Sequence, residues 1–334
     1  MLFSGKKHRN MVLLIYICGG DFMEWYYVLL IVLGSILLLI LLTTYICYKI
    51  AFYSNNKKAL VDEVVLPNQK IFNTFREQII QDVTDIRALP YQEYEIKSFD
   101  GLTLKAKYYE CKKGAPIEIM IHGYRGNGER DLSTGIKRAF LCQRNAFVVD
   151  QRGSGSSSGH VLTFGIKERK DCVAWAHFVS QTFGEDITIF LTGISMGAAT
   201  VLLASSMDLP KNVKGVLADC GYDNASTMIK KVIKGLKLPA KIFYPFVKLG
   251  ARLFGKFNLE ETSPYESVQH SKLPIIFIHG TDDSLVPCQM SRNLYDVCVS
   301  KKKLVEIENA DHGVAYLVNP ELYIKELNDF FNNL

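Results

Sequence analysis

The chain has 334 residues, of which 48% are hydrophobic and 22% charged, and its net charge is +5. The apolar fraction is large enough to bury a core, which excludes a disordered chain. The net charge is too small to imply a nucleic-acid partner. Once an apolar N-terminal part is set aside, the remaining length fits a single domain of about 250 residues.

Residues 1–25 begin with a basic patch, Lys6 to Arg9, and an apolar stretch too short to cross a bilayer. Residues 19–23 can be encoded as GGA GGT GAT TTC ATG, a bacterial ribosome-binding site just ahead of a start codon at Met23. Our hypothesis is that translation starts at Met23 and leaves residues 1–22 out of the protein. N-terminal sequencing of the natural protein that finds Met1 or Leu2 would refute it.

Residues 26–48 form one uncharged, apolar run that as a helix would reach roughly 34 Å, enough to cross a bilayer. A cleaved signal peptide is the alternative, but the run is too long and no small-residue cleavage site follows it. Aromatic residues flank both ends, where interfacial anchors are expected: Trp25, Tyr26, Tyr27, Tyr45 and Tyr48. The pattern predicts a single transmembrane helix and hence a cell-membrane protein.

The cations that flank this run bear on its orientation. Lys49, Lys57 and Lys58 follow it, and with a start at Met23 they favour a cytoplasmic C-terminal domain. With a start at Met1 the basic patch competes, and the orientation stays open. Residues 49–90 form a connector, with a helical apolar pattern between Ile71 and Val83.

From residue 91 to 334 the pattern is one of alternating strands and helices. A hairpin is predicted around Asp100-Gly101. Apolar runs predict strands at 117–121, 146–150, 187–192, 213–219, 274–278 and 304–307, with helices at 166–178 and 320–331. This alternation predicts a mostly parallel, doubly wound α/β sheet, in which ligands bind at the carboxyl ends of the strands.

Four short motifs fall at those strand ends. Gly193-Ile-Ser195-Met-Gly197 stands where a buried strand changes to small residues suited to a helix, so the serine would be held in a sharp turn above the sheet. The others are His122-Gly-Tyr-Arg-Gly126, Asp150-Gln-Arg-Gly153, and His279-Gly-x-x-Asp283-x-x-Val-Pro287 followed by Asp311-His312-Gly313. In these motifs and their order, residues 91–334 resemble the α/β hydrolases, and more narrowly the membrane-tethered serine hydrolases.

A serine hydroxyl is a poor nucleophile unless a base takes its proton and an anion orients that base. The chain order Ser195, Asp283, His312 is that of the α/β hydrolases, so we expect His312 to be the base and Asp283 the acid. Three rival acids remain open: Asp219, Asp282 and Asp311.

A developing oxyanion needs two fixed N–H donors. The resemblance implies that the backbone N–H groups of Tyr124 and Met196 supply them. The sequence has no P-loop, dinucleotide fingerprint or metal-ligand spacing, so we expect no cofactor and no metal. Its eight cysteines are scattered, which is typical of buried small hydrophobic residues in a reducing compartment.

These features predict a serine hydrolase, carboxylesterase-like or lipase-like, that cleaves acyl esters or thioesters through an acyl-enzyme. A serine peptidase shares the same residues, and a non-catalytic membrane-tethered binding module on this fold is the second alternative. The oligomeric state stays open.

The last prediction concerns a helical lid at residues 224–262. Between 224 and 258 it carries eight Lys or Arg and no Asp or Glu, a local charge of +8, interleaved with apolar residues. Basic amphipathic helices of this kind bind anionic bilayer surfaces. The alternative is a solvated lid whose apolar face only covers the pocket. We expect the domain without residues 1–50 to bind anionic vesicles.

Overall fold

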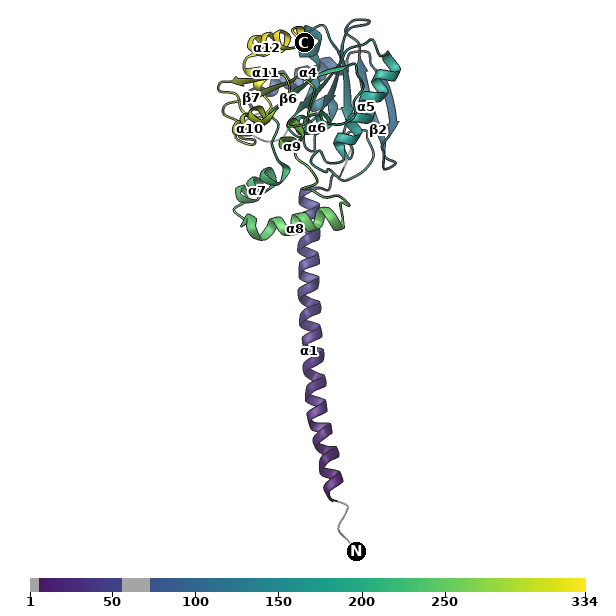
Figure 1. The fold of residues 1–334 in the computed structure, drawn as a ribbon, viewed down its shortest axis with the longest axis vertical. Coiled ribbons are helices and arrows are strands. Elements are labelled where there is room, and N and C mark those ends of the chain that lie inside the picture. Colours follow the sequence, from purple (N-terminus) through teal and green to yellow (C-terminus); the bar gives the residue numbers. More distant parts are fainter. Residues whose placement is uncertain (1–5, 56–72) are drawn as a thin grey trace.

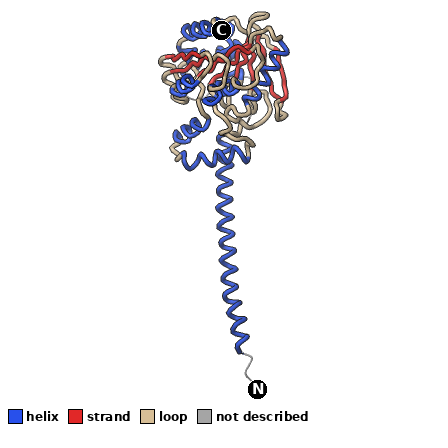
Figure 2. The backbone as a smooth tube through the Cα atoms, in the orientation of Figure 1, coloured by secondary structure: helices blue, strands red, loops and turns tan. Residues whose placement is uncertain are grey.

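The computed structural model describes residues 6–55 and 73–334, with side chains described from Glu24 onward. One long helix, α1 (Lys6–Ala51), projects from a domain built on a single sheet (Figure 1). The strands all lie in the part of the molecule farthest from the N-terminus, as the colouring in Figure 2 shows. Residues 56–72 of the predicted connector lie outside the described part, and α3 (Arg76–Arg87) follows them.

The sheet has eight strands in the order β1-β2-β4-β3-β5-β6-β7-β8. The hairpin pairs β1 with β2 and joins β4 antiparallel, and all other pairings are parallel. This confirms the predicted fold class. The strands are β1 (Gln92–Lys97), β2 (Thr103–Tyr109), β3 (Ile117–Ile121), β4 (Asn145–Asp150), β5 (Ile189–Ile194), β6 (Val213–Asp219), β7 (Ile275–Gly280) and β8 (Lys302–Ile307).

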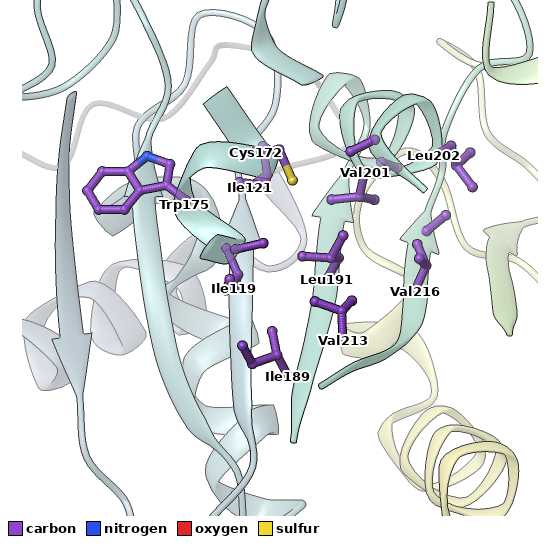
Figure 3. Close-up of a cluster of buried hydrophobic side chains, with 14 of the residues drawn as sticks. Ile119, Ile121, Cys172, Trp175, Ile189, Leu191, Val201, Leu202, Val213 and Val216 are labelled. Atoms are coloured by element: carbon purple, nitrogen blue, oxygen red, sulfur yellow. The ribbon is translucent and has the colours of Figure 1, made fainter. Parts of the chain in front are cut away.

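Helices cover both faces of the sheet. On one face α5 (Glu168–Phe183), α6 (Met196–Ala204) and α10 (Gln289–Val297) pack on the strands, and Figure 3 shows part of this core. On the other face lie α3, α4 (Gly128–Leu141) and α12 (Pro320–Asn332), and the short α11 (Ala315–Val318) precedes α12. Because both faces are covered, β3 and β7 are buried along their whole length, which is why both strands are mostly apolar, with Glu118 of β3 as the charged exception.

The segment between β6 and β7 forms α7 (Ala225–Gly235), α8 (Ala240–Leu253) and α9 (Pro264–Val268). The first two lie beside the end of α1 that meets the domain (Figure 1). The sequence predicts breaks near Pro239 and Pro245. Pro239 does precede α8, but Pro245 lies inside it, since Tyr244 and Val247 on either side are buried and hold the helix together.

α1 crosses α8 at the end nearest the domain (Figure 1). The crossing is close because Gly250 of α8 has no side chain: a Cβ there would lie 3.0 Å from the carbonyl oxygen of Thr44 and 3.0 Å from Cβ of Tyr48. Thr44 and Tyr48 are buried, so the expectation that Tyr48 anchors at the lipid interface is wrong. Residues 24–42 of α1 are exposed and, apart from Glu24 and Ser35, apolar, and the helix from Glu24 to Ala51 is a candidate membrane span.

Candidate active site

Ser195 lies at the corner between β5 and α6, with φ 56° and ψ −117°. A side-chain-bearing residue rarely adopts this left-handed backbone, and its neighbours must enforce it. A Cβ on Gly193 would lie 2.2 Å from the carbonyl oxygen of Gly197, and one on Gly197 would lie 2.0 Å from that of Ile121. The turn therefore requires both glycines, and it leaves the serine at the N-terminus of α6.

His312 follows β8 and Asp283 follows β7, so both residues lie at the same edge of the sheet as Ser195. His312 Nε2 is 2.9 Å from Ser195 Oγ, and its Nδ1 is 2.8 Å from Asp283 Oδ2. With Asp283 ionised, Nδ1 carries the proton and Nε2 accepts the serine hydroxyl. The structure thus joins the three residues singled out in the sequence in one hydrogen-bonded chain.

The Asp283 carboxylate accepts hydrogen bonds at both oxygens. Oδ1 accepts from the backbone N–H of Leu285 at 2.9 Å and of Val286 at 2.7 Å, and Oδ2 faces His279 Nε2 at 3.0 Å besides His312. Burial alone would raise its pKa, but the hydrogen bonds from His279 and His312 hold the pKa of Asp283 well below its usual range. It is therefore an anion at neutral pH.

The rival acids have other partners. Asp219 accepts from the hydroxyl of Tyr323 at 2.8 Å, and Asp311 accepts from the backbone N–H and the hydroxyl of Ser284. Asp282 is exposed and accepts from the hydroxyl of Thr281. None of the three forms a side-chain hydrogen bond with the His312 ring among the described residues.

The loop after β3 lies against the serine, since a Cβ on Gly123 would be 3.6 Å from Ser195 Cβ. His122 fixes this loop to the next strand end: its Nε2 accepts from the N–H of Gln151 at 3.0 Å, and its carbonyl accepts from the Gln151 amide at 2.7 Å. Within the described part of the chain the N–H groups of Tyr124 and Met196 donate to no other group. Both are available to a ligand beside Ser195.

Cys220, which directly follows β6, lies beside Asp283 and His312. Its Sγ, an Asp283 oxygen and a His312 nitrogen lie within 4.8 Å of one another, and these atom types can bind a metal ion. Both His312 nitrogens are already hydrogen bonded, however, and burial raises the pKa of the Cys220 thiol, which disfavours the thiolate a metal needs. The group fits a hydrogen-bonded site better than a metal site.

Two parts of the site were missed from the sequence. His279, which the sequence singles out only as the start of a motif, contacts Asp283 directly, and its Nδ1 lies 2.6 Å from the hydroxyl of Ser291. Its position four residues before the acid was a usable signal. The second is a contact of the Tyr124 and Arg125 side chains with the end of α1, and no local sequence pattern indicates it.

Comparison with known proteins agrees with this geometry. Residues 119–255 match the family model for the alpha/beta hydrolase fold. The chain is 26% identical to protein YqkD of Bacillus subtilis, over 77% of this chain and 87% of that protein. It is 24% identical to the lysophosphatidylserine lipase ABHD12 of Danio rerio, over 60% of this chain and 52% of that one.

Among solved structures, the Pyrococcus furiosus esterase Pf2001 matches with a TM-score of 0.61 and 21% identity, covering 84% of this chain and 98% of the esterase. The sheet order, the serine corner and the match to the family model show that the chain has the α/β-hydrolase fold. It is a hydrolase-fold protein with a candidate membrane anchor at its N-terminal side.

Proposed function

We propose that this protein is a serine hydrolase that cleaves acyl esters or thioesters, with Ser195 as nucleophile, His312 as general base and Asp283 as the acid that orients it. The observation that carries the proposal is the unbroken chain from Ser195 Oγ to His312, at 2.9 Å, and on to Asp283, at 2.8 Å. The similarity to an esterase and to a lipase supports acyl substrates.

The chemistry proceeds in two halves. Ser195 Oγ attacks the acyl carbon as its proton passes to His312 Nε2, and the carbonyl oxygen becomes an oxyanion that accepts from the N–H groups of Tyr124 and Met196. The tetrahedral adduct collapses, His312 gives its proton to the leaving alcohol or thiol, and the acyl group stays on Ser195. Water, deprotonated by His312, then releases the acid. Asp283 stabilises the imidazolium in both halves.

Position relative to a bilayer supports a substrate drawn from the membrane. Exposed cations on and beside α7 and α8 alternate with exposed apolar residues (Lys230, Lys234, Lys237, Lys241, Arg252, Lys256; Val232, Leu236, Leu238, Ile242, Leu253). We call this the basic platform. It lies where α1 leaves its exposed apolar stretch, so a bilayer around α1 would meet it. In this proposal residues 224–262 serve as a lid that admits acyl chains, and the cations after α1 favour a cytoplasmic domain.

The test is activity of the purified full chain in detergent. A fluorophosphonate probe should label the wild type, and Ser195→Ala should lose labelling and about 10⁴-fold in ester hydrolysis. Ser206→Ala removes an exposed serine near the end of the same helix and should keep both.

Folded Ser195→Ala with near-normal turnover would end the proposal. A panel of short and long acyl esters, thioesters and aminoacyl amides decides the reaction class. Preference for the amides would make the protein a peptidase. No turnover and no labelling of the wild type would favour a binding module.

A further inference from the structure

The carboxyl end of α1 meets the loop that carries Tyr124. The Tyr124 hydroxyl donates to the carbonyl of Ala51 at 2.9 Å. The Arg125 guanidinium donates to the carbonyls of Ile50 at 2.8 Å and Tyr53 at 2.9 Å. The last carbonyls of a helix lack intrahelical donors and carry its negative end, so a guanidinium there is a well-matched partner.

The loop that carries Tyr124 also contains a residue with an unfavourable backbone conformation. Arg125 has φ 53°, in the left-handed region that residues with side chains rarely adopt. Such a conformation persists only where its surroundings enforce it. The turn is closed by a backbone hydrogen bond from the Gly126 N–H to the Gly123 carbonyl at 3.3 Å, and the Arg125 side chain adds its contacts with α1 and lies 5.0 Å from the centre of the Tyr124 ring. Released from α1, the loop could relax and move the Tyr124 N–H.

The end of α1 is itself fixed within the domain rather than hanging from it. Phe52 is fully buried, and its carbonyl accepts from the N–H of Leu162 at 2.8 Å. Ser54 donates its N–H to the carbonyl of His160 at 2.8 Å. Phe164, from the same stretch of chain, packs on both Phe52 and Tyr124, with ring centres 5.9 Å and 5.3 Å apart. The anchor and the loop are therefore parts of one packed unit.

We propose that Tyr124 and Arg125 are positioning residues through which the end of the membrane helix sets the oxyanion hole. The Tyr124 side chain and Arg125 bind α1, and the Tyr124 N–H, one residue from Gly123 at the serine, binds the oxyanion. The anchor thus completes the catalytic geometry in addition to locating the enzyme. This inference rests on the proposed function.

The experiment compares Tyr124→Phe and Arg125→Met with wild type, all as full chains in the same detergent. The substrate is a water-soluble short-chain ester, so that access to a membrane does not affect the rates. Misplacement of one oxyanion donor should lower kcat by about 10- to 100-fold with KM unchanged. Affinity for a trifluoromethyl ketone, which forms a tetrahedral adduct on Ser195, should fall by the same factor. Arg125→Lys should recover part of kcat.

Arg292→Met is the matched control, since this arginine of α10 pairs on the surface with Glu306, and it should keep kcat and ketone affinity. If Tyr124→Phe and Arg125→Met lower only the melting temperature and leave kcat and ketone affinity unchanged, the contacts are merely structural and the inference is overturned. Failure of the proposed function would look different, because wild type itself would then bind no ketone and hydrolyse no ester.

Discussion

The carboxylate of Asp283 has four hydrogen-bond donors around it, so this position requires a side chain that accepts hydrogen bonds at both oxygens. In Asp283→Asn the amide cannot accept at both positions, and the tautomer of His312 is no longer fixed. We expect about a 10⁴-fold loss of kcat. Asp282→Asn changes an exposed neighbour and should cost little. Steady-state ester hydrolysis with both variants checks this, and the reverse pattern would move the acid by one residue.

Glu118 is a second buried carboxylate, in the middle of the sheet, and it serves stability. It pairs with Arg138 at 2.6 Å and Arg144 at 3.0 Å. Burial alone would raise its pKa, but these guanidinium groups hold the pKa of Glu118 at about 2, against an ordinary 4.5. A lowered folded-state pKa stabilises the fold above about pH 4.5, and that contribution is lost as pH falls toward 2.

Glu118→Gln leaves two buried cations without their anion, so we expect a loss of about 3–5 kcal/mol in the free energy of unfolding at pH 7. The loss should shrink at pH 3, where wild type has given up part of the same contribution. Urea unfolding at both pH values measures it. Glu95→Gln, which breaks an exposed pair with Lys105, is the control and should change little. An equal loss at both pH values would contradict the role given to the charge.

At the scale of elements, the crossing of α1 over α8 depends on one residue without a side chain. Gly250→Leu places atoms where Thr44 and Tyr48 already lie, so the helices must separate. We expect a destabilisation of about 1–3 kcal/mol, seen as a lower melting temperature of the full chain in detergent. Gly235→Leu, at the end of α7 with open space around its Cβ position, is the matched control. Equal melting temperatures for the two variants would show that the crossing is not tightly packed.

The strands could be predicted closely because burial on both faces makes them largely apolar: the predicted segments 117–121 and 213–219 coincide with β3 and β6. The hairpin at Asp100-Gly101 was equally local, with Gly101 at φ 86°. The helix break predicted at Pro245 is wrong, because burial of the neighbouring side chains outweighs the backbone hydrogen bond that proline cannot donate. The contact of α1 with α8 and Arg125 could not be predicted, since it joins segments that are far apart in sequence and share no local pattern.

At the candidate active site, too, local sequence patterns predict some features and miss those that depend on three-dimensional contacts. Motif spacing singled out Ser195, Asp283 and His312, which the structure brings within hydrogen-bond distance. It favoured Asp283 but left Asp219 open as a rival, because both lie at the ends of neighbouring strands and only three-dimensional geometry shows that Asp219 faces Tyr323. It also left out Cys220, whose nearness to the pair depends on how β6 lies beside β7.

At the scale of the whole molecule, the basic platform lies beside the end of α1, and we propose that both face the bilayer. We expect a chain lacking residues 1–42, which keeps Thr44 and Tyr48 on α8, to sediment with anionic vesicles at low salt. Each cation near the surface contributes about 1 kcal/mol, so added salt should weaken binding. This cut is better than one after residue 50, which would remove the packing of Tyr48.

The matched variant changes four platform lysines (Lys230, Lys234, Lys237 and Lys241) to Gln in the same shortened chain. It should lose most of the sedimented fraction and keep its melting temperature, because these side chains are exposed. Neutral vesicles serve as a second control. If the shortened chain stays in solution at low salt, or binds as well without these four charges, the segment acts only as a cover over the pocket.

α1 continues unbroken from Lys6 to Ala51, and its last turn is held by the domain (Figure 1). In a bilayer, no flexible linker would separate the membrane-spanning part of α1 from the domain. The distance of Ser195 from the lipid would then be set by the geometry of the helix. Under the proposed function, an enzyme anchored in this way would meet substrates that diffuse laterally in the membrane. Its rate would follow the mole fraction of substrate in the surrounding leaflet, and inert lipid would slow it as an added solvent slows a reaction in a flask.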